Sequence, residues 1–424
     1  MADNLWLGTA SAVAQVDTFT PATVEVNDVF TLTATAEDGS TTAAVSFTAT
    51  ATTVANVCTG LAAAWNASTN ALHTPITAAD GVTEITLTAD TAGVPFYVAS
   101  TTTDGGGNDT QTLTRAATTA NSGPNDWNTA ANWSLAAVPV ATNAVYFENS
   151  AISVTYGLYA AAAIELASLT IAQTYTGTIG TTSAYMQIES ALVDIGAYYG
   201  TASPAGSGRI RLNLGTLATA ITIHNSATTA TDTNYAPIRL LCVNAANVIN
   251  ARKGTVSIAD DAPGEVSTVA TINVSYVSAM STDANVIIGS GVTLTTLTKI
   301  GGAATLECAA TTATQTGGTL TTAGSGTITT LNAKGGTLTT TGSGAITTAN
   351  ISGGTVYLNS TGTIGDLVIT GSPVISFAQS NETRTVSDAS IDGSATVILG
   401  DPAVVIFTDD ISFGQVMITT TKLN

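Results

Sequence analysis

This chain of 424 residues has few charged side chains: only 9% are Asp, Glu, Lys or Arg, against roughly a quarter in an ordinary globular protein. The low charge does not indicate disorder, because 44% of the residues are hydrophobic and disordered chains combine high charge with few apolar residues. The length allows about two to four domains with cores of their own. We therefore expect a folded protein of several units.

Basic residues are especially scarce. The chain has 10 Lys and Arg against 29 Asp and Glu, which gives a formal net charge of −19. Affinity for a polyanion depends on clustered Lys and Arg, and most of the basic residues here are scattered. We therefore expect no nucleic-acid partner.

Cysteine is nearly absent and provides neither a disulfide framework nor a metal site. Cys58, Cys242 and Cys308 lie far apart, each among apolar or small residues, and no C-x-x-C spacing occurs. We expect buried free thiols, no metal and no cofactor.

Secretion and membrane signals are missing from the pattern. The N-terminal residues MADNLWLGTASAVAQVD lack the basic region of a standard secretory signal. No stretch approaches the 18 or more consecutive apolar residues typical of a membrane helix. We expect a protein that stays in the cytoplasm or is built into an assembly formed there, with no membrane partner.

Catalytic groupings are also lacking. Enzymes on β-helical scaffolds need carboxylates that converge on a groove, yet residues 317–365 contain no Asp or Glu. The only histidines, His73 and His224, lie in no recognisable triad or metal motif. We predict that the protein is not an enzyme and has no catalytic residues.

What the sequence does contain is alternation, as in VFTLTATA, TEITLTAD and GRIRLNL. A period of two, rich in Val, Ile and Thr, predicts β-strands and a mainly β protein. One segment, residues 53–68, has helical spacing instead, with Thr53 as the N-cap. We predict a small α+β domain over 15–103, in which this helix covers an antiparallel sheet, and a linker over 104–122 that begins in the Gly- and Asp-rich TDGGGND.

The C-terminal half repeats itself every 18 residues. Gly-Gly pairs stand at 317, 335 and 353, and each unit carries its own Gly turn, as expected of a solenoid. One unit cannot bury its apolar face alone, but stacked coils align Leu320, Leu338 and Tyr357 or neighbouring positions and satisfy the backbone between layers. We predict a Gly/Thr-rich β-solenoid over 271–400, which forms a stiff rod with a mechanical role.

The remaining segments complete the predicted organisation. Residues 1–14 form an N-terminal arm, 123–270 form a β-rich domain that opens the solenoid, and 401–424 form a C-terminal cap or an interface. The last segment is assigned in this way because it is more apolar than the repeat and departs from it.

Two segments carry a resemblance. LWLGTASAVAQVDTFTP, with the β-rich sequence and the helix that follow, looks like the N-terminal module of virion structural proteins of tailed bacteriophages and prophages. GPNDWNTAANW, followed by Gly/Thr-rich repeats, is similar to the β-solenoid part of the same group, and a related opening occurs in bacterial surface proteins. The resemblance implies a capsid- or tail-associated role and no active-site residues.

From these observations we expect a non-enzymatic virion protein, a capsid decoration or head-fibre protein that docks through its N-terminal part and projects a solenoid. Leu5, Trp6 and Leu7 form an apolar tip that is the predicted docking site, with self-packing of this tip as the alternative. The expected partners are the major capsid protein or other virion proteins, and further copies of the chain in a homotrimer. Alternative functions are a tail fibre or tailspike that binds a host glycan, and a cell-surface adhesin.

Overall fold

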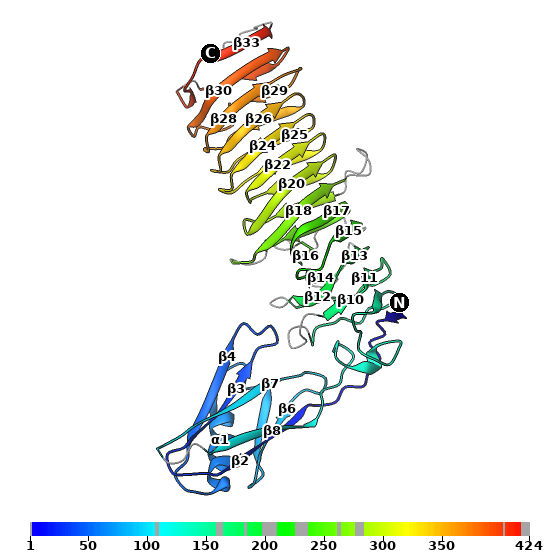
Figure 1. Ribbon diagram of the computed structural model, residues 1–424, viewed down its shortest axis with the longest axis vertical. Helices are drawn as coiled ribbons and strands as arrows, with labels where there is room; N and C mark the ends of the chain where they lie inside the picture. Colours follow the sequence, from blue (N-terminus) through cyan, green and yellow to red (C-terminus); the bar gives the residue numbers. More distant parts are fainter. Residues whose placement is uncertain are drawn as a thin grey trace.

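The computed structural model describes residues 2–106, 110–157, 164–181, 185–196, 210–224, 236–260, 264–275, 284–401 and 403–416. These residues form a small α+β domain with antiparallel sheets and a long solenoid with parallel sheets (Figure 1). The prediction of a mainly β chain with this combination of parts is confirmed.

The α+β domain contains two antiparallel sheets, with strand orders β5-β6-β2-β8 and β4-β3-β7. One helix contacts strands of both sheets. The elements are β2 (Val16–Ala22), β3 (Val29–Thr35), β4 (Thr42–Thr48), α1 (Val54–Ala67), β5 (Ile76–Asp80), β6 (Ile85–Ala89), β7 (Tyr97–Thr103) and β8 (Thr112–Thr119).

Helix α1 forms where the helical spacing predicts it. The side chain of Thr53 accepts a hydrogen bond from the backbone N–H of Asn56 at 3.3 Å, which is an N-cap. Trp65 is fully buried and donates its indole N–H to the carbonyl of Ile76 at 2.9 Å. The helix and Thr53 as its cap are therefore confirmed.

The predicted linker over 104–122 is wrong in its central part, because strand β8 lies there. β8 pairs antiparallel with β2 from Ala22↔Thr112 to Val16↔Thr119, so the sheet extends beyond residue 103. Its sequence, TLTRAATT, buries only Leu113. An edge strand with one buried residue lacks the strong alternation that marks a half-buried strand.

The solenoid consists of two parallel sheets, and most strands pair with the strand two further along the chain. The first sheet contains β1 (Ala2–Leu5), β9 (Asn143–Phe147), β11 (Ser168–Ile171), β13 (Leu192–Ile195), β15 (Ala220–His224), β17 (Val243–Ile258), β18 (Ser267–Val274), β20 (Val292–Lys299), β22 (Ala310–Gln315), β24 (Ile328–Ala333), β26 (Ile346–Ile351), β28 (Ile364–Ile369), β30 (Arg384–Gly393), β32 (Val405–Phe407) and β33 (Ile411–Val416).

The second sheet lies opposite the first, and β17 contributes its C-terminal half to it. Its other strands are β10 (Ile164–Leu166), β12 (Met186–Ser190), β14 (Ile210–Asn213), β16 (Ile238–Leu241), β19 (Ala284–Ile288), β21 (Ala303–Leu306), β23 (Thr319–Thr322), β25 (Thr337–Thr340), β27 (Thr355–Leu358), β29 (Val374–Ser376) and β31 (Thr396–Ile398).

The 18-residue repeat sets the register of the stack. Leu320 pairs with Leu338 and Leu338 with Val356, and all three are buried. Neighbouring layers of a sheet lie about 4.8 Å apart, so the apolar side chains form a continuous column. Tyr357 pairs with Thr339 instead and is half-buried. Val356 therefore takes the place in this column that the sequence analysis assigned to Tyr357 or a neighbour.

Glycine is required at one corner of each repeat. Gly318, Gly336 and Gly354 have φ of 66°, 78° and 82°, in the left-handed region that favours glycine. They also stack closely: a Cβ on Gly336 would lie 2.3 Å from the carbonyl oxygen of Gly318. The repeated Gly-Gly pair thus provides both the turn and the space for the coil below.

The solenoid is continuous where the sequence predicted two domains. The expected boundary between 270 and 271 falls inside β18, which pairs with β17 on one side and β20 on the other. Of the predicted cap over 401–424, β32 and β33 continue the first sheet by pairing with β30. Residues 417–424 lie outside the described residues.

The α+β domain is an insertion near the start of the solenoid. β1 pairs in parallel with β9, from Ala2↔Asn143 to Leu5↔Tyr146, and the sequence between these strands contains the whole domain. The two connecting segments meet in an antiparallel bridge between Val13 and Ser122. In Figure 1 the N-terminus accordingly lies at the bend of the molecule, and the C-terminus lies at the far end of the solenoid.

Candidate docking surface

The first residues of the chain form the first strand of the solenoid, so the predicted arm over 1–14 is wrong for residues 2–6. The outer edge of β1 is covered by the segment around Trp133, which forms an antiparallel bridge with Trp6. The backbone N–H of Leu5 donates to Ser134 Oγ at 2.9 Å, and the N–H of Ser134 donates to the carbonyl of Leu5 at 3.0 Å. Covering an edge strand prevents uncontrolled pairing with other chains.

Trp6 is a core residue and is not available for docking. Only 1% of it is exposed, and its indole N–H donates to the carbonyl of Ile152 at 3.0 Å. The prediction that Trp6 belongs to an exposed docking tip is therefore wrong, and the alternative of self-packing holds for this residue. The physical reason is that β1 pairs in parallel with β9. This pairing directs the side chain of Trp6, the residue directly after β1, towards the solenoid interior.

An aromatic cluster closes the base of the solenoid core. The rings of Trp6 and Trp133 lie 5.0 Å apart, and those of Trp127 and Trp133 lie 4.5 Å apart, both edge to face. Phe147 and Tyr175 continue the cluster at 5.2 Å. Edge-to-face packing is the favoured arrangement of aromatic rings, so large rings fill the end of the core where smaller side chains would leave space.

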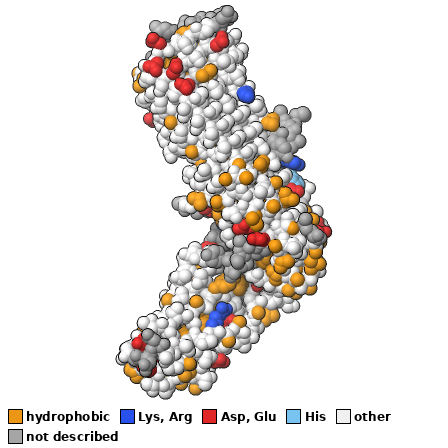
Figure 2. Space-filling view, in the orientation of Figure 1, with side chains coloured by type: hydrophobic (Ala, Val, Ile, Leu, Met, Phe, Trp, Pro, Cys, Tyr) orange, Lys and Arg blue, Asp and Glu red, His pale blue; other side chains and the backbone are white. Residues whose placement is uncertain are grey.

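Exposed apolar side chains surround this closed base. We call Leu7, Leu135, Val140 and Ile152 the base patch; their exposed fractions are 42%, 47%, 59% and 37%. Figure 2 shows hydrophobic side chains gathered at the bend, where the α+β domain meets the solenoid. Clustered exposed apolar side chains mark interaction sites more often than single ones do.

Backbone and side-chain hydrogen bonds bring the base patch together. The N–H of Leu7 donates to the carbonyl of Asn132 at 2.7 Å, and the N–H of Leu135 donates to Asn4 Oδ1 at 3.2 Å. A Cβ on Gly8 would meet the side chain of Ile152, so Leu7 and Ile152 are also neighbours. The patch therefore lies on three segments outside the strands: Leu7 just after β1, Leu135 and Val140 before β9, and Ile152 after β9.

The base patch overlaps only in part with the predicted docking residues. Leu7 is exposed and belongs to it, Leu5 is half-buried on β1, and Trp6 is buried. Leu135, Val140 and Ile152 were not among the predicted docking residues. The run SLAAVPVAT, residues 134–142, was a usable signal, because it is apolar without the alternation of a strand.

No basic residue is close in sequence to the base patch. No Lys or Arg occurs between residues 116 and 208. A partner of this surface would therefore bind through apolar contacts and hydrogen bonds, because no basic side chain is close in the sequence to attract an anionic group.

Neither histidine belongs to the base patch. His73 is buried; its Nε2 lies 3.1 Å from the carbonyl oxygen of Ala43 and therefore donates, so its Nδ1 accepts from Ser68 Oγ at 2.7 Å. His224 is half-exposed and contacts Asp194 Oδ1 through Nε2 at 2.6 Å. His73 thus has a structural role, and His224 forms a surface pair.

The cysteines are free and buried, as predicted. Burial raises the pKa of the Cys58 thiol to about 11 and that of Cys242 and Cys308 to about 12. Such thiols are protonated at neutral pH and are poor nucleophiles. Within the described part of the chain, no group of three or more His, Cys, Asp or Glu side chains could hold a metal ion.

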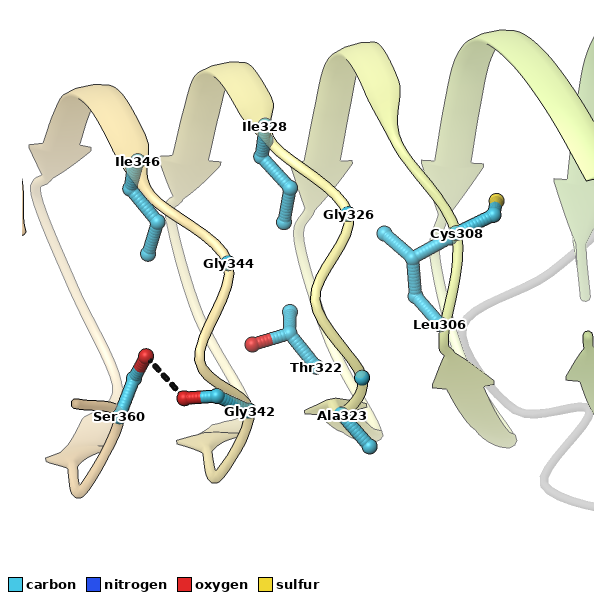
Figure 3. Close-up of a pocket in the computed structure, with 11 residues that line it drawn as sticks. Leu306, Cys308, Thr322, Ala323, Gly326, Ile328, Gly342, Gly344, Ile346 and Ser360 are labelled. Atoms are coloured by element: carbon cyan, nitrogen blue, oxygen red, sulfur yellow. Dashed lines mark hydrogen bonds between the residues drawn. The ribbon is translucent and has the colours of Figure 1, made fainter. Parts of the chain in front are cut away.

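A small hollow lies inside one corner of the repeat, next to the glycines that Figure 3 labels. Ser360 Oγ donates to the carbonyl of Gly342 across it. Its lining contains no Asp, Glu, Lys, Arg or His, and the space for water is about 10 Å³, enough for one water molecule. This hollow cannot hold an organic substrate.

Comparisons with protein-family models, with curated proteins and with solved structures find no significant match to this chain. Among the described residues, no helix has the length and apolar character to cross a membrane.

Proposed function

We propose that this protein is a non-enzymatic structural component of a bacteriophage virion, a capsid decoration or head-fibre protein. It docks on the major capsid protein or another virion protein through the base patch and projects the solenoid outwards. The observation that carries the proposal is the asymmetric rod: an apolar surface and an inserted domain at one end, and a repetitive stack at the other. The resemblance of the LWLGTASAVAQVDTFTP and GPNDWNTAANW segments supports the assignment to a virion.

The solenoid suits a mechanical role. Each layer pairs its backbone with the layers on both sides, so the rod needs few charges and resists local opening. The inserted domain widens the base without interrupting the stack, because β1 and β9 still pair. Assembly as a homotrimer would place three base patches around one axis and enlarge the apolar contact.

Counting copies tests the proposal. Purified virions from a strain that encodes this chain should contain it in a fixed ratio to the major capsid protein, as measured by quantitative mass spectrometry. A high ratio supports decoration, whereas a few copies per particle support the alternative of a tail fibre or tailspike. If the chain is absent from virions, the proposal is contradicted. A role outside the particle, such as that of a surface adhesin, is then supported.

A charge in the base patch should weaken docking. Val140→Asp and Leu135→Asp each place a carboxylate in the proposed apolar contact, which should reduce incorporation into particles by roughly tenfold or more. Val266→Asp is the matched control, because Val266 is 65% exposed on a solenoid coil above the patch. Equal incorporation of all three variants, with circular dichroism spectra unchanged, would show that the base patch is not the docking surface.

A further inference from the structure

The last described coil leaves the end of the core open. Along one column of the first sheet, Ile351 and Ile369 are each 1% exposed, Ile391 is half-buried, and Phe413 is 52% exposed. The column in the second sheet shows the same trend, because Ile375 is buried and Val397 is half-buried. Positions that form the core in every earlier coil are therefore accessible here.

The strands of this coil also have free outer edges. β31 pairs only with β29, and β32 and β33 pair only with β30, among the residues that the structure describes. An edge of this kind presents unpaired N–H and C=O groups in a row. It can accept a further strand by main-chain hydrogen bonding. We call the outer surface of β31, β32 and β33 the distal end.

The exposed charge at the distal end has one sign, since Arg384 at the start of β30 is buried. Residues 385–416 contain five aspartates and no Lys, Arg or Glu, whereas residues 317–365 contain no acid at all. The five aspartates are exposed, and no ion pair joins them to a described residue; they are Asp388, Asp392, Asp401, Asp409 and Asp410. The negative charge is thus concentrated where the core is open.

One of these aspartates also stacks on a carboxylate of the preceding coil. Asp366 pairs directly with Asp388, and Asp410 immediately precedes Ile411, which pairs with Ala389. Like charges in directly paired positions destabilise a sheet. A positively charged group that binds alongside this column would remove that repulsion.

We propose that the distal end binds a cationic polypeptide segment, which adds as a strand to the outer edge of β33 and covers the open core. Lys or Arg side chains on one face of the added strand meet the aspartates, and apolar side chains on the other face contact Phe413 and Ile411. A second copy of the chain is disfavoured as the occupant, because two distal ends would bring ten carboxylates together. This proposal does not depend on the function proposed above.

The test uses the full 424-residue chain and a synthetic peptide of alternating lysine and valine; a peptide of alternating glutamate and valine is the control. Fluorescence anisotropy should show saturable binding of the lysine peptide only. Raising the ionic strength from about 0.05 M to about 0.5 M should weaken it by roughly tenfold, because the charges are exposed and screened by salt. Hydrogen exchange should show new protection of the β33 amides, which electrostatic adhesion alone would not produce.

Matched variants separate the distal end from general negative charge. Asp409→Asn with Asp410→Asn should weaken binding by about fivefold or more, whereas Asp3→Asn with Asp90→Asn, which removes two exposed charges elsewhere, should leave it within about twofold. The proposal is overturned by equal binding of both peptides, by equal effects of the two double variants, or by the absence of β33 protection. Binding that requires removal of residues 417–424 would also overturn it, because those residues would then be the occupant.

Discussion

At the residue scale, the solenoid core contains polar side chains that donate hydrogen bonds to the turns, and of these groups Gln315 Oε1 alone is buried without a partner. Lys299 pairs with Gln315 in the stack, and both are fully buried. Lys299 Nζ donates to the carbonyl of Gly317 at 2.7 Å, and Gln315 Nε2 donates to the carbonyls of Gly318 and Thr337 at 2.8 and 2.9 Å. These side chains occupy the interior at a corner where backbone carbonyls point inwards, which explains why polar residues are tolerated there.

Lys299 makes stability depend on pH. Desolvation by burial lowers its pKa from 10.5 to about 8, so between these pH values the unfolded chain holds more protons than the folded protein. The free energy of unfolding should therefore rise with pH across this window, by about 3 kcal/mol, and the cost of the buried charge is fully present below pH 8. Lys299→Met should remove this rise and stabilise the protein at neutral pH.

Urea unfolding followed by circular dichroism at several pH values measures this effect. The difference between the wild-type protein and the variant isolates Lys299 from the cysteines and tyrosines that also titrate at alkaline pH. Lys299→Gln is a useful control, because it keeps a donor for Gly317 but has no charge. Parallel stability curves for the wild type and Lys299→Met would contradict the assigned cause.

At the scale of the element, the 18-residue coil is a module whose contacts are almost entirely with its neighbours in the stack. β24, β26 and β28 pair at equal intervals, with Ile328, Ile346 and Ile364 in one column. The turns repeat too, because Gly318, Gly336 and Gly354 all have positive φ. The stability of such an array is approximately a sum of coil and interface contributions.

Removing one whole coil should therefore preserve the fold. Deletion of residues 335–352 joins coils of matching register, so every remaining apolar side chain keeps its place. We expect an unchanged circular dichroism spectrum, a cooperative unfolding transition and a slightly lower melting temperature. Deletion of residues 335–343, half a coil, is the control and should disrupt the stack. Similar losses of structure in both deletions would contradict the modular description.

At the scale of the whole molecule, the inserted domain and the solenoid are joined where the segments around Val13, Gly93 and Ser122 pack closely together. We call this junction the neck. The N–H of Val13 donates to the carbonyl of Ser122 at 2.8 Å, and the N–H of Gly93 donates to the carbonyl of Val13 at 3.1 Å. A Cβ on Gly123 would lie 2.8 Å from the Cα of Gly93. Two glycines in contact let the backbones approach closely, so three segments pack at the junction.

A side chain at this contact should loosen the bend. Gly123→Val forces the segments of the neck apart, so we expect small-angle X-ray scattering to show a broader range of overall dimensions while the circular dichroism spectrum stays the same. Ala116→Val is a suitable control, because Ala116 is exposed on β8 and a β-branched side chain suits a strand. Identical scattering curves for wild type and Gly123→Val would show that the neck does not set the orientation of the domain.

The sequence alone predicted the elements whose signal is local and periodic. Helix α1 and its cap follow from the spacing around Thr53 and Trp65, and the solenoid follows from the 18-residue period, because a repeat with Gly turns can bury its apolar face only by stacking. The sequence left open whether Tyr357 or a neighbour fills the core column, and the pairing of Leu338 places Val356 there, because adjacent residues of a strand point to opposite faces.

Tertiary structure alone decided where the first residues lie and which apolar side chains stay exposed. β1 pairs with a strand 141 residues later, since Ala2 lies opposite Asn143. Nothing local in ADNLW indicates that partner, so the burial of Trp6 and the base patch could not be derived from the pattern. The edge strand β8 was missed for the same reason, since its place comes from pairing with β2. Local periodicity determines the repeating coil, whereas contacts between segments distant in sequence determine how the rod begins and what its base presents to a partner.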